Sequence, residues 1–334
     1  MPRMKRADLT ARQYVDGVVG GDRAVLARAI TLVESNAPAH QALAQAVLTE
    51  LLPRRGHSVR VGITGVPGAG KSTLIEALGT LLTARGRRVA VTAIDPSSSL
   101  TGGSILGDKT RMEKLAVDER AFIRPSPSGG TLGGVARKTR ETIVLFEAAG
   151  YDVIIVETVG VGQSEAQVRS MVDFFLLVLL AGAGDELQGF KRGVIELADA
   201  IAVNKADGPG QAAAELCRAG FAGVLPYLQP ATEGWQTRAH TCSALNGDGL
   251  AGLWSVVEAF ERHAGASGAW QHRRGEQERA WVRDLVREGL EERFRAQPGV
   301  AERQAQLEAE VVAGRMPATA AAQKLLELFG GGAA

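Results

Sequence analysis

The sequence has few cysteines, no long apolar run and no excess of charge of either sign. Its two cysteines, Cys217 and Cys242, are too few for a disulfide scaffold and indicate a reducing compartment. The longest apolar run, Phe174 to Ala181, is far shorter than the roughly 20 residues that cross a bilayer, so we interpret it as a strand buried on both faces. The 38 basic and 37 acidic residues give a net charge of +1, which predicts no basic surface for nucleic acid or an anionic membrane.

The amino terminus lacks the pattern of a secretory signal. Residues Met1 to Arg6 are basic, but no apolar segment follows them. A mitochondrial transit peptide stays open at this point, although Asp8 and the early start of a helical pattern argue against one. We therefore expect a soluble, cytoplasmic protein with no nucleic-acid partner and no membrane association.

The chain is long enough for one large domain with appendages, because single cores stop growing near about 250–300 residues and this chain has 334. Its first part shows only helical spacing, from Tyr14 to Val33 and again from Gln41 to Leu52. A change of pattern follows, and another comes near residue 265. We predict a helical N-terminal extension at residues 1–57, a main domain at 58–264 and a helical C-terminal extension at 265–334.

In the main domain, short β-branched runs alternate with helical stretches, which is typical of a mostly parallel sheet flanked by helices. The expected strands are Val59–Thr64, Arg88–Asp95, Ala121–Arg124, Val153–Glu157, Phe174–Leu180, Ala200–Asn204, Val224–Leu225 and His240–Ser243. The expected helices are Lys71–Arg85, Thr131–Ala149, Gln163–Val172, Gly193–Leu197, Gly210–Ala219 and Leu250–His263. The predicted fold class is therefore α/β.

The C-terminal extension begins with a predicted linker, Gly265–Gly268, and continues as charged helices at Glu276–Gln297, Val300–Val312 and Ala318–Phe329. In the first of these helices, Trp281 and Leu285 form one apolar stripe, and Val282 and Val286 form another beside it. These stripes could pack within the chain or against a second copy. We favour a homodimer contact, because so polar a segment would bury little by itself.

A phosphate-binding loop follows the first expected strand. The segment fits G-x-x-x-x-G-K-[ST] between a strand and a helix, and its residues are Gly65, Val66, Pro67, Gly68, Ala69, Gly70, Lys71, Ser72 and Thr73. Glycines let successive backbone N–H groups point at an anion beside a helix N-terminus. In this pattern Lys71 places its charge on the β- and γ-phosphates, and the Ser72 hydroxyl binds Mg²⁺. The sequence thus defines a P-loop.

Acidic residues at other expected strand ends are candidate metal groups. Glu157 closes the run Val153–Glu157, and Gly160 comes three positions later, which matches a Walker B acid and a glycine whose backbone N–H contacts the γ-phosphate. Asp95 ends the second expected strand, and Asp108 lies in the Ser- and Gly-rich loop that follows, of a kind that a γ-phosphate can order. Asp108 could instead serve as a helix cap or a turn residue.

A second motif predicts which nucleotide base is bound. The buried run Ala200–Asn204 leads into N-K-x-D, formed by Asn204, Lys205 and Asp207. A carboxylate at Asp207 can accept from N1–H and the 2-amino group of guanine, which adenine lacks, while the Lys205 stem lies along the base. Asn204 is expected to bond the other edge of the base. A later loop is expected to contact guanine through backbone N–H groups, at Ser243, Ala244 and Leu245. The expected ligands are therefore GTP or GDP with Mg²⁺.

The residues for hydrolysis are less complete than those for binding. Val161 stands where small GTPases carry the glutamine that orients water, and valine cannot do so. We therefore expect slow turnover. Catalytic assistance would come from a partner or from a basic residue such as Lys191, which could equally be a solvated residue at the entry of a helix. The predicted catalytic residues are Lys71, Glu157, Gly160 and Lys191.

Taken together, these motifs resemble the methylmalonyl-CoA mutase-associated GTPases of the MeaB/ArgK type, over about residues 10 to 330. The segments that carry the resemblance are Gly65–Thr73, Asp95–Ser99, Thr101–Met112, Glu157–Gln163 and Asn204–Asp207. The resemblance implies a P-loop GTPase and a homodimer joined through the C-terminal extension. It also implies a chaperone that gates cofactor loading into an adenosylcobalamin-dependent acyl-CoA mutase and protects or reactivates that mutase.

Three other functions remain open from the residues alone. A metal-insertion GTPase, for example for nickel, would need a Cys/His cluster, and His240 with Cys242 is the one close pair. Spacing of two on a strand is more often core than ligand. A kinase of a transport protein would need a phosphoacceptor site, which we do not find. A binding module without turnover is opposed by the complete P-loop and Walker B pattern, and Val161 keeps it open.

Overall fold

The computed structural model describes residues 9–94, 112–125, 132–158, 164–181 and 192–330. By their packing, these residues form two compact units, Met1–Arg274 and Gly275–Ala334. The N-terminal helices, which the sequence sets apart as residues 1–57, pack within the first unit. None of the helices in the described ranges is long and apolar enough to cross a membrane.

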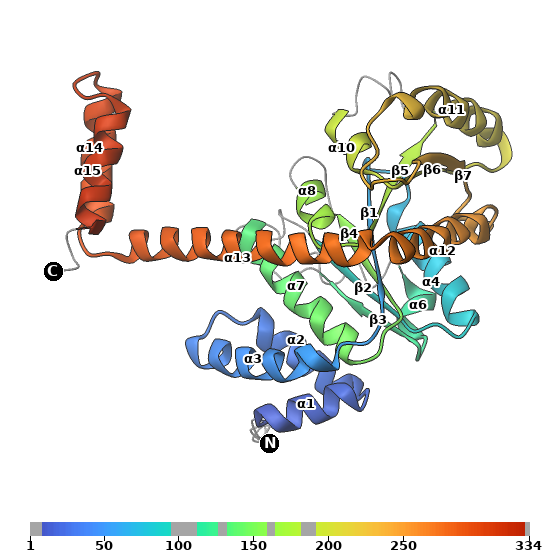
Figure 1. The fold of residues 1–334 in the computed structure, drawn as a ribbon, viewed down its shortest axis with the longest axis horizontal. Helices are drawn as coiled ribbons and strands as arrows, with labels where there is room; N and C mark the ends of the chain where they lie inside the picture. The colour runs from blue at the N-terminus through green and yellow to red at the C-terminus, as the bar shows by residue number, and fades with distance from the viewer. Residues whose placement is uncertain (1–8, 95–111, 126–131, 159–163, 182–191, 331–334) are drawn as a thin grey trace. The chain divides into compact units, whose positions relative to one another are not determined.

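A seven-stranded sheet forms the centre of the first unit (Figure 1), in the order β3-β2-β4-β1-β5-β6-β7. All of its strand pairs are parallel, which confirms the predicted α/β class. The strands are β1 (Val59–Gly65), β2 (Val89–Ile94), β3 (Ala121–Arg124), β4 (Val153–Thr158), β5 (Phe174–Leu180), β6 (Ala200–Asn204) and β7 (Arg238–Thr241). Their carboxyl ends share one edge of the sheet, where ligands of such folds bind.

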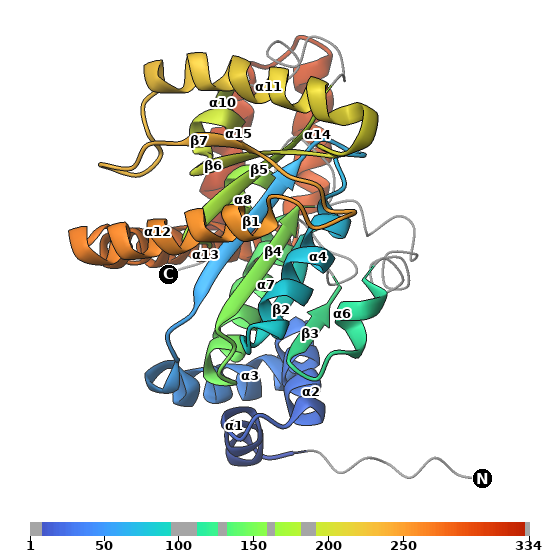
Figure 2. The ribbon, with the colours of Figure 1, turned by 90° about the vertical axis from the view of Figure 1, so that its right-hand side faces the viewer.

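Helices cover both faces of the sheet (Figure 2), so the inner strands are apolar on both sides. One apolar cluster joins a face of the sheet to α4 (Lys71–Ala84), α6 (Glu113–Val117) and α12 (Leu250–Ser267). The other joins the opposite face to α7 (Leu132–Ala148) and α8 (Ser164–Arg169). A smaller cluster lies near the β7 edge and includes residues of α10 (Arg192–Leu197) and α11 (Gln211–Val224).

The N-terminal helices lie against α7, on the side away from the sheet (Figure 1). They are α1 (Ala11–Val19), α2 (Arg23–Glu34) and α3 (Pro38–Leu51). The continuous helical spacing predicted for Tyr14–Val33 is broken because Gly21 adopts φ +75° and Asp22 caps α2 by accepting from two backbone N–H groups. The apolar faces of α1–α3 join the same cluster as α7, so this segment completes the core of the first unit.

Two predicted elements near the sheet edge are corrected. Val224–Leu225 is not a strand: Val224 ends α11, and Leu225 begins the short 3₁₀ helix η3 (Leu225–Tyr227). Phe221 and Leu225, four residues apart, are buried, whereas Val224 is exposed, so the apolar residues belong to a helical stripe. The last strand lies two residues earlier than expected, at Arg238–Thr241 instead of His240–Ser243.

The predicted linker is also corrected. Gly265 to Ser267 form the end of α12, and Gly268 alone makes the break, with φ +75°. The next helix, α13 (Ala269–Ala296), therefore begins seven residues before the expected Glu276. In the second unit, α14 (Val300–Val312) packs against α15 (Ala318–Gly330), with Val300 and Leu307 buried.

A repeated aspartate fixes the amino edge of the sheet. Each of β4, β5 and β6 is preceded by an aspartate whose carboxylate accepts a backbone N–H from the neighbouring strand. Asp152 accepts from Arg88 at 2.7 Å, Asp173 accepts from Arg60 at 2.9 Å, and Asp199 accepts from Phe175 at 2.9 Å. These bonds set the starting points of adjacent parallel strands without relying on the loops at the other edge.

Two of these aspartates also bind arginines at the start of α13. The Arg274 guanidinium donates to both Asp173 oxygens, at 2.8 and 2.7 Å, and to the Ser58 carbonyl at 2.8 Å. Arg273 lies 3.7 Å from the Asp199 carboxylate and donates to the Thr232 hydroxyl. Both carboxylates are almost fully buried, so loss of the Asp173 charge would remove the nearest carboxylate of Arg274, whose guanidinium also lies 3.5 Å from Glu147.

The substitution Asp173→Asn keeps the side-chain volume but removes this charge. We expect it to lower the free energy of unfolding by about 3 kcal/mol, the usual cost of breaking a buried ion pair. Urea denaturation measures this value. The matched control Asp284→Asn removes a carboxylate that is 54% exposed and should change stability by less than about 0.5 kcal/mol. Equal effects of the two substitutions would contradict the role given to Asp173.

Candidate nucleotide-binding site

The P-loop connects β1 to α4 at the carboxyl edge of the sheet, as the sequence predicts. Its three glycines, Gly65, Gly68 and Gly70, all have positive φ, and the first and last are also closely packed. A side chain at Gly65, where φ is +153°, would place its Cβ 2.0 Å from the Val178 carbonyl oxygen of β5. A side chain at Gly70, where φ is +83°, would meet the Asn204 amide nitrogen at 2.7 Å. The loop is thus packed against the strands on the base side of the site.

The Lys71 ammonium lies over this loop. It donates to the carbonyls of Gly65 and Val66, at 2.9 and 3.3 Å. Burial lowers the pKa of Lys71, and the carboxylates of Glu157 and Glu165 partly oppose that shift. Glu165, on α8, is 6% exposed and so belongs to the electrostatic surroundings of the P-loop lysine.

Ser72 and Glu157 meet beside the lysine. The Ser72 hydroxyl donates to a Glu157 carboxylate oxygen at 2.9 Å. Glu157 sits near the end of β4, and the hydroxyls of Thr64 and Thr158 are bonded at 2.8 Å across β1 and β4. A hydroxyl and a carboxylate together form the hard oxygen donor set that Mg²⁺ prefers. These two residues therefore fit the predicted metal, which would take its remaining ligands from phosphate and water.

Four predicted site residues lie outside the described residues. They are the candidate metal groups Asp95 and Asp108, the γ-phosphate contact Gly160 and the basic residue Lys191. Val161, on which the expectation of slow turnover rests, lies outside them as well. The described part of the site therefore consists of the P-loop, Glu157 and the base-binding loops.

Asn204 joins three loops that are far apart in the sequence. Its amide nitrogen donates to the Ala69 carbonyl of the P-loop at 2.8 Å, and its amide oxygen accepts from the Ala244 backbone N–H at 3.0 Å. The side chain is 1% exposed. An amide nitrogen carries two hydrogens, so the contact with Ala69 leaves one for the edge of a purine. Asn204 is therefore expected to contact the base and also holds the P-loop and the Ala244 loop together. We call this second function its bracing role, and the motif alone does not predict it.

The other base-side residues are arranged around Asp207. The Ser243 hydroxyl donates to the Asp207 carboxylate and also accepts from the Asn246 backbone N–H at 3.3 Å. Ser243 is buried, whereas Leu245 is 83% exposed. Lys205 has φ +60°, the one positive value outside glycine among the described residues. Backbone held in such a sparsely populated region marks a constrained functional loop.

The pair that kept metal insertion open, His240 and Cys242, is not part of a metal cluster in the described ranges. Among the described residues no group of three or more His, Cys, Asp and Glu side chains is placed to hold an ion. Burial raises the pKa of the Cys242 thiol to about 12, so it remains protonated at neutral pH. Its sulfur lies 3.8 Å from the Asn204 amide oxygen, inside the base-side packing.

Comparison with known proteins agrees with this arrangement. The model of the family described as methylmalonyl Co-A mutase-associated GTPase MeaB matches residues 26–299, most of the chain. The chain belongs to this family. GTPase ArgK of Escherichia coli is 51% identical over 268 residues, covering 80% of this chain and 81% of that protein. The mitochondrial methylmalonic aciduria type A homolog of Mus musculus is 44% identical over 332 residues, covering 95% and 80%.

A solved structure supports the same assignment. The crystal structure of the LAO/AO transport system kinase superposes with a TM-score of 0.79 at 38% identity, covering 97% of this chain and 99% of that chain. This MeaB family member is thus a GTPase with a P-loop fold, which implies that it binds GTP and GDP. The resemblance drawn from the motifs and the predicted fold class are both confirmed.

Asn204→Ala tests the bracing role of the amide. It removes the contacts with Ala69 and Ala244 together, so we expect the affinity for GTP and GDP to fall by about tenfold or more, since buried partners are left unpaired. Isothermal titration calorimetry measures both affinities. Asn36→Ala, at an exposed asparagine in the loop before α3, is the matched control and should leave them unchanged. Wild-type affinity in Asn204→Ala would refute the bracing role.

Proposed function

We propose that this GTPase is a chaperone of an adenosylcobalamin-dependent acyl-CoA mutase of the methylmalonyl-CoA mutase type. It gates cofactor loading and protects or reactivates the mutase. The observation that carries the proposal is the match over residues 26–299 to a family named for its association with that mutase. The name of the mouse relative, which refers to methylmalonic aciduria, supports the same connection.

In this proposal the described residues hold the nucleotide in a defined position. Lys71 binds the β- and γ-phosphates, replacing its contacts with the carbonyls of Gly65 and Val66. Ser72 and Glu157 hold Mg²⁺, together with Asp95 and Asp108, the other two metal groups that the sequence predicts. The bound metal supplies positive charge against the phosphates. The other P-loop residues contact the phosphates, and Gly160 and Lys191 lie near the γ-phosphate. Guanine is bound by Lys205, Asp207 and Ser243–Leu245.

Hydrolysis is slow in this proposal and is completed by the partner. Val161 follows the proposed γ-phosphate contact, and an apolar side chain there cannot orient a water molecule for attack. The bound nucleotide therefore persists until a second protein supplies or positions the missing group. Such dependence connects GTP turnover to the presence of the mutase. The two cysteines form no disulfide, which is consistent with a cytoplasmic setting.

We further propose a homodimer formed through the C-terminal extension. Within the second unit, Val282, Val286 and Leu290 are 60%, 56% and 50% exposed. They recur every four residues along α13 and so form one apolar stripe on that helix. A second copy of the same stripe would cover it in a symmetric contact. Light scattering that gave the monomer mass at all concentrations would remove this part of the proposal.

A second candidate function has one specific observation in its favour. The solved structure with a TM-score of 0.79 is named as a transport system kinase. A kinase would transfer the γ-phosphate of GTP to a protein, whereas the chaperone would release it as inorganic phosphate. The two activities therefore differ in the fate of the same phosphate.

The direct test adds a purified cobalamin-dependent acyl-CoA mutase to the GTPase and follows phosphate release. We expect the turnover number to rise at least about tenfold, because the partner completes a site that lacks a water-orienting residue. Lys71→Ala, which loses the phosphate contact, is the control and should show no stimulation. With GTP labelled at the γ-position, transfer of label to a protein would favour the kinase. Neither binding nor stimulation by the mutase would overturn the chaperone proposal.

A further inference from the structure

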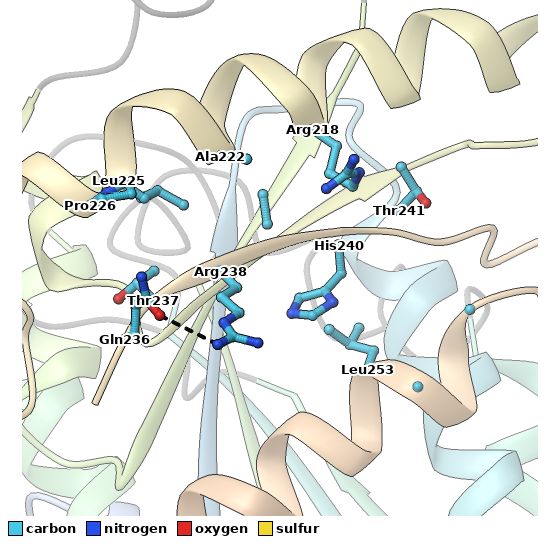
Figure 3. Close-up of a pocket in the computed structure, with 13 residues that line it drawn as sticks. Arg218, Ala222, Leu225, Pro226, Gln236, Thr237, Arg238, His240, Thr241 and Leu253 are labelled. Carbon is cyan, nitrogen blue, oxygen red and sulfur yellow. Dashed lines mark hydrogen bonds between the residues drawn. The ribbon is translucent and has the colours of Figure 1, made fainter. Parts of the chain in front are cut away.

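A groove runs along the open edge of the sheet, away from the P-loop. Among the strands of the described residues, β7 has one hydrogen-bonded neighbour, β6, and none on its other side. A pocket of about 630 Å³ lies along its other side, between α11 and α12 (Figure 3). Consecutive residues from Gln236 to Thr241 line this pocket, together with Arg218 of α11 and Leu253 of α12. The edge of the strand itself is thus part of the pocket wall.

The backbone of β7 directs hydrogen-bonding groups toward this groove. The N–H of Cys242 donates to the Val203 carbonyl of β6 at 2.9 Å, so Cys242 faces its sheet neighbour. Since successive residues of a strand direct their N–H and C=O groups to opposite edges, those of Thr237, Ala239 and Thr241 face outward. Such an edge is a template for one more strand, and natural proteins usually cover or pair it.

Basic and imidazole side chains stand on both sides of this edge. In Figure 3, Arg218 approaches from α11, whereas Arg238 and His240 extend toward α12. The described residues place no carboxylate within 4.0 Å of the Arg238 guanidinium, whose one polar contact is the Gln236 amide oxygen at 3.4 Å. Arg218 pairs with Glu215 at the rim through both Nε and Nη2, so a carboxylate of a partner would share Arg218 with Glu215.

His240 adds a second observation. Its Nε2 atom is buried and, among the described residues, has no hydrogen-bond partner. Burial, and then the charges of Arg238 and Arg218, lower the pKa of His240, so its ring is neutral at physiological pH. A buried polar atom without a partner costs free energy, and a side chain from an incoming segment would recover it.

The groove is longer than a small ligand requires. A second cavity of about 240 Å³ shares four lining residues with the first, Leu225, Pro226, Gln236 and Thr237. It continues the groove past the beginning of β7 to Pro230 and Trp235. A continuous channel along a strand edge suits an extended chain, because main-chain bonds can form along it while alternate side chains enter the flanking space.

We propose that β7 binds an extended acidic segment of a partner protein as an eighth strand of the sheet. The outward groups of Thr237 and Ala239 and the N–H of Thr241 form the main-chain bonds, whereas the Thr241 carbonyl lies against Gly249. Because side chains of an added strand alternate between its two faces, carboxylates at successive positions meet Arg218 on one side and Arg238 with His240 on the other. This surface is distinct from the nucleotide site and does not depend on the identity of the mutase.

The first experiment uses the full chain and a synthetic peptide of about eight residues, a normal strand length, with glutamate at both odd and even positions. Amide hydrogen exchange should slow at Thr237, Ala239 and Thr241 when the peptide is added. The amides of His240 and Cys242, which face β6, should not change. A matched peptide with lysine in place of glutamate should not bind. Failure of the acidic peptide to protect the outward amides would overturn the proposal.

Variants and modified peptides separate strand addition from simple charge attraction. Arg238→Glu should weaken the acidic peptide by about tenfold at low salt, whereas Arg54→Glu, the same charge change at an exposed residue before β1, should not. N-methylation of alternate peptide amides should abolish binding in one register and be tolerated in the other. Equal binding of both methylated peptides, or an equal effect of the two arginine variants, would exclude an added strand.

Discussion

The nucleotide site depends on the buried amide of Asn204. This side chain holds the Ala69 carbonyl of the P-loop and the Ala244 backbone N–H of the last base-side loop at the same time. The same side chain therefore joins the P-loop to the base-side loops. Gly70 makes this possible, because any side chain there would collide with the Asn204 amide nitrogen. The glycine serves the contact between loops as well as the approach of a phosphate.

The opposite edge of the sheet is fixed by different chemistry. Asp152, Asp173 and Asp199 each set the beginning of a neighbouring strand through a backbone N–H. Asp173 and Asp199 form ion pairs with Arg274 and Arg273 at the start of α13. These contacts lie within the first unit and connect the beginning of the C-terminal extension to the sheet.

The sequence predicts the parts of this protein that are local in the chain. The P-loop, the Walker B strand and the N-K-x-D motif carry their own spacing, and the strands that lead into them are found where the apolar runs place them. The weaker predictions fall where packing decides. Val224 and Leu225 have strand-forming side chains but belong to a helical stripe, and the glycines of 265–268 predict a linker where all but Gly268 are helical.

Contacts between residues that are distant in the sequence are not predicted either, because packing decides them. The pairs Asn204–Ala69 and Asp173–Arg274 join positions more than 100 residues apart, and no local sequence pattern predicts these contacts. We propose that Asp207 recognises guanine, and its carboxylate accepts a hydrogen bond from the Ser243 hydroxyl. The most direct test is the affinity of Asp207→Asn for GTP and for xanthosine triphosphate. We predict that GTP weakens and the xanthine nucleotide becomes the preferred ligand; an unchanged preference for GTP would contradict the account.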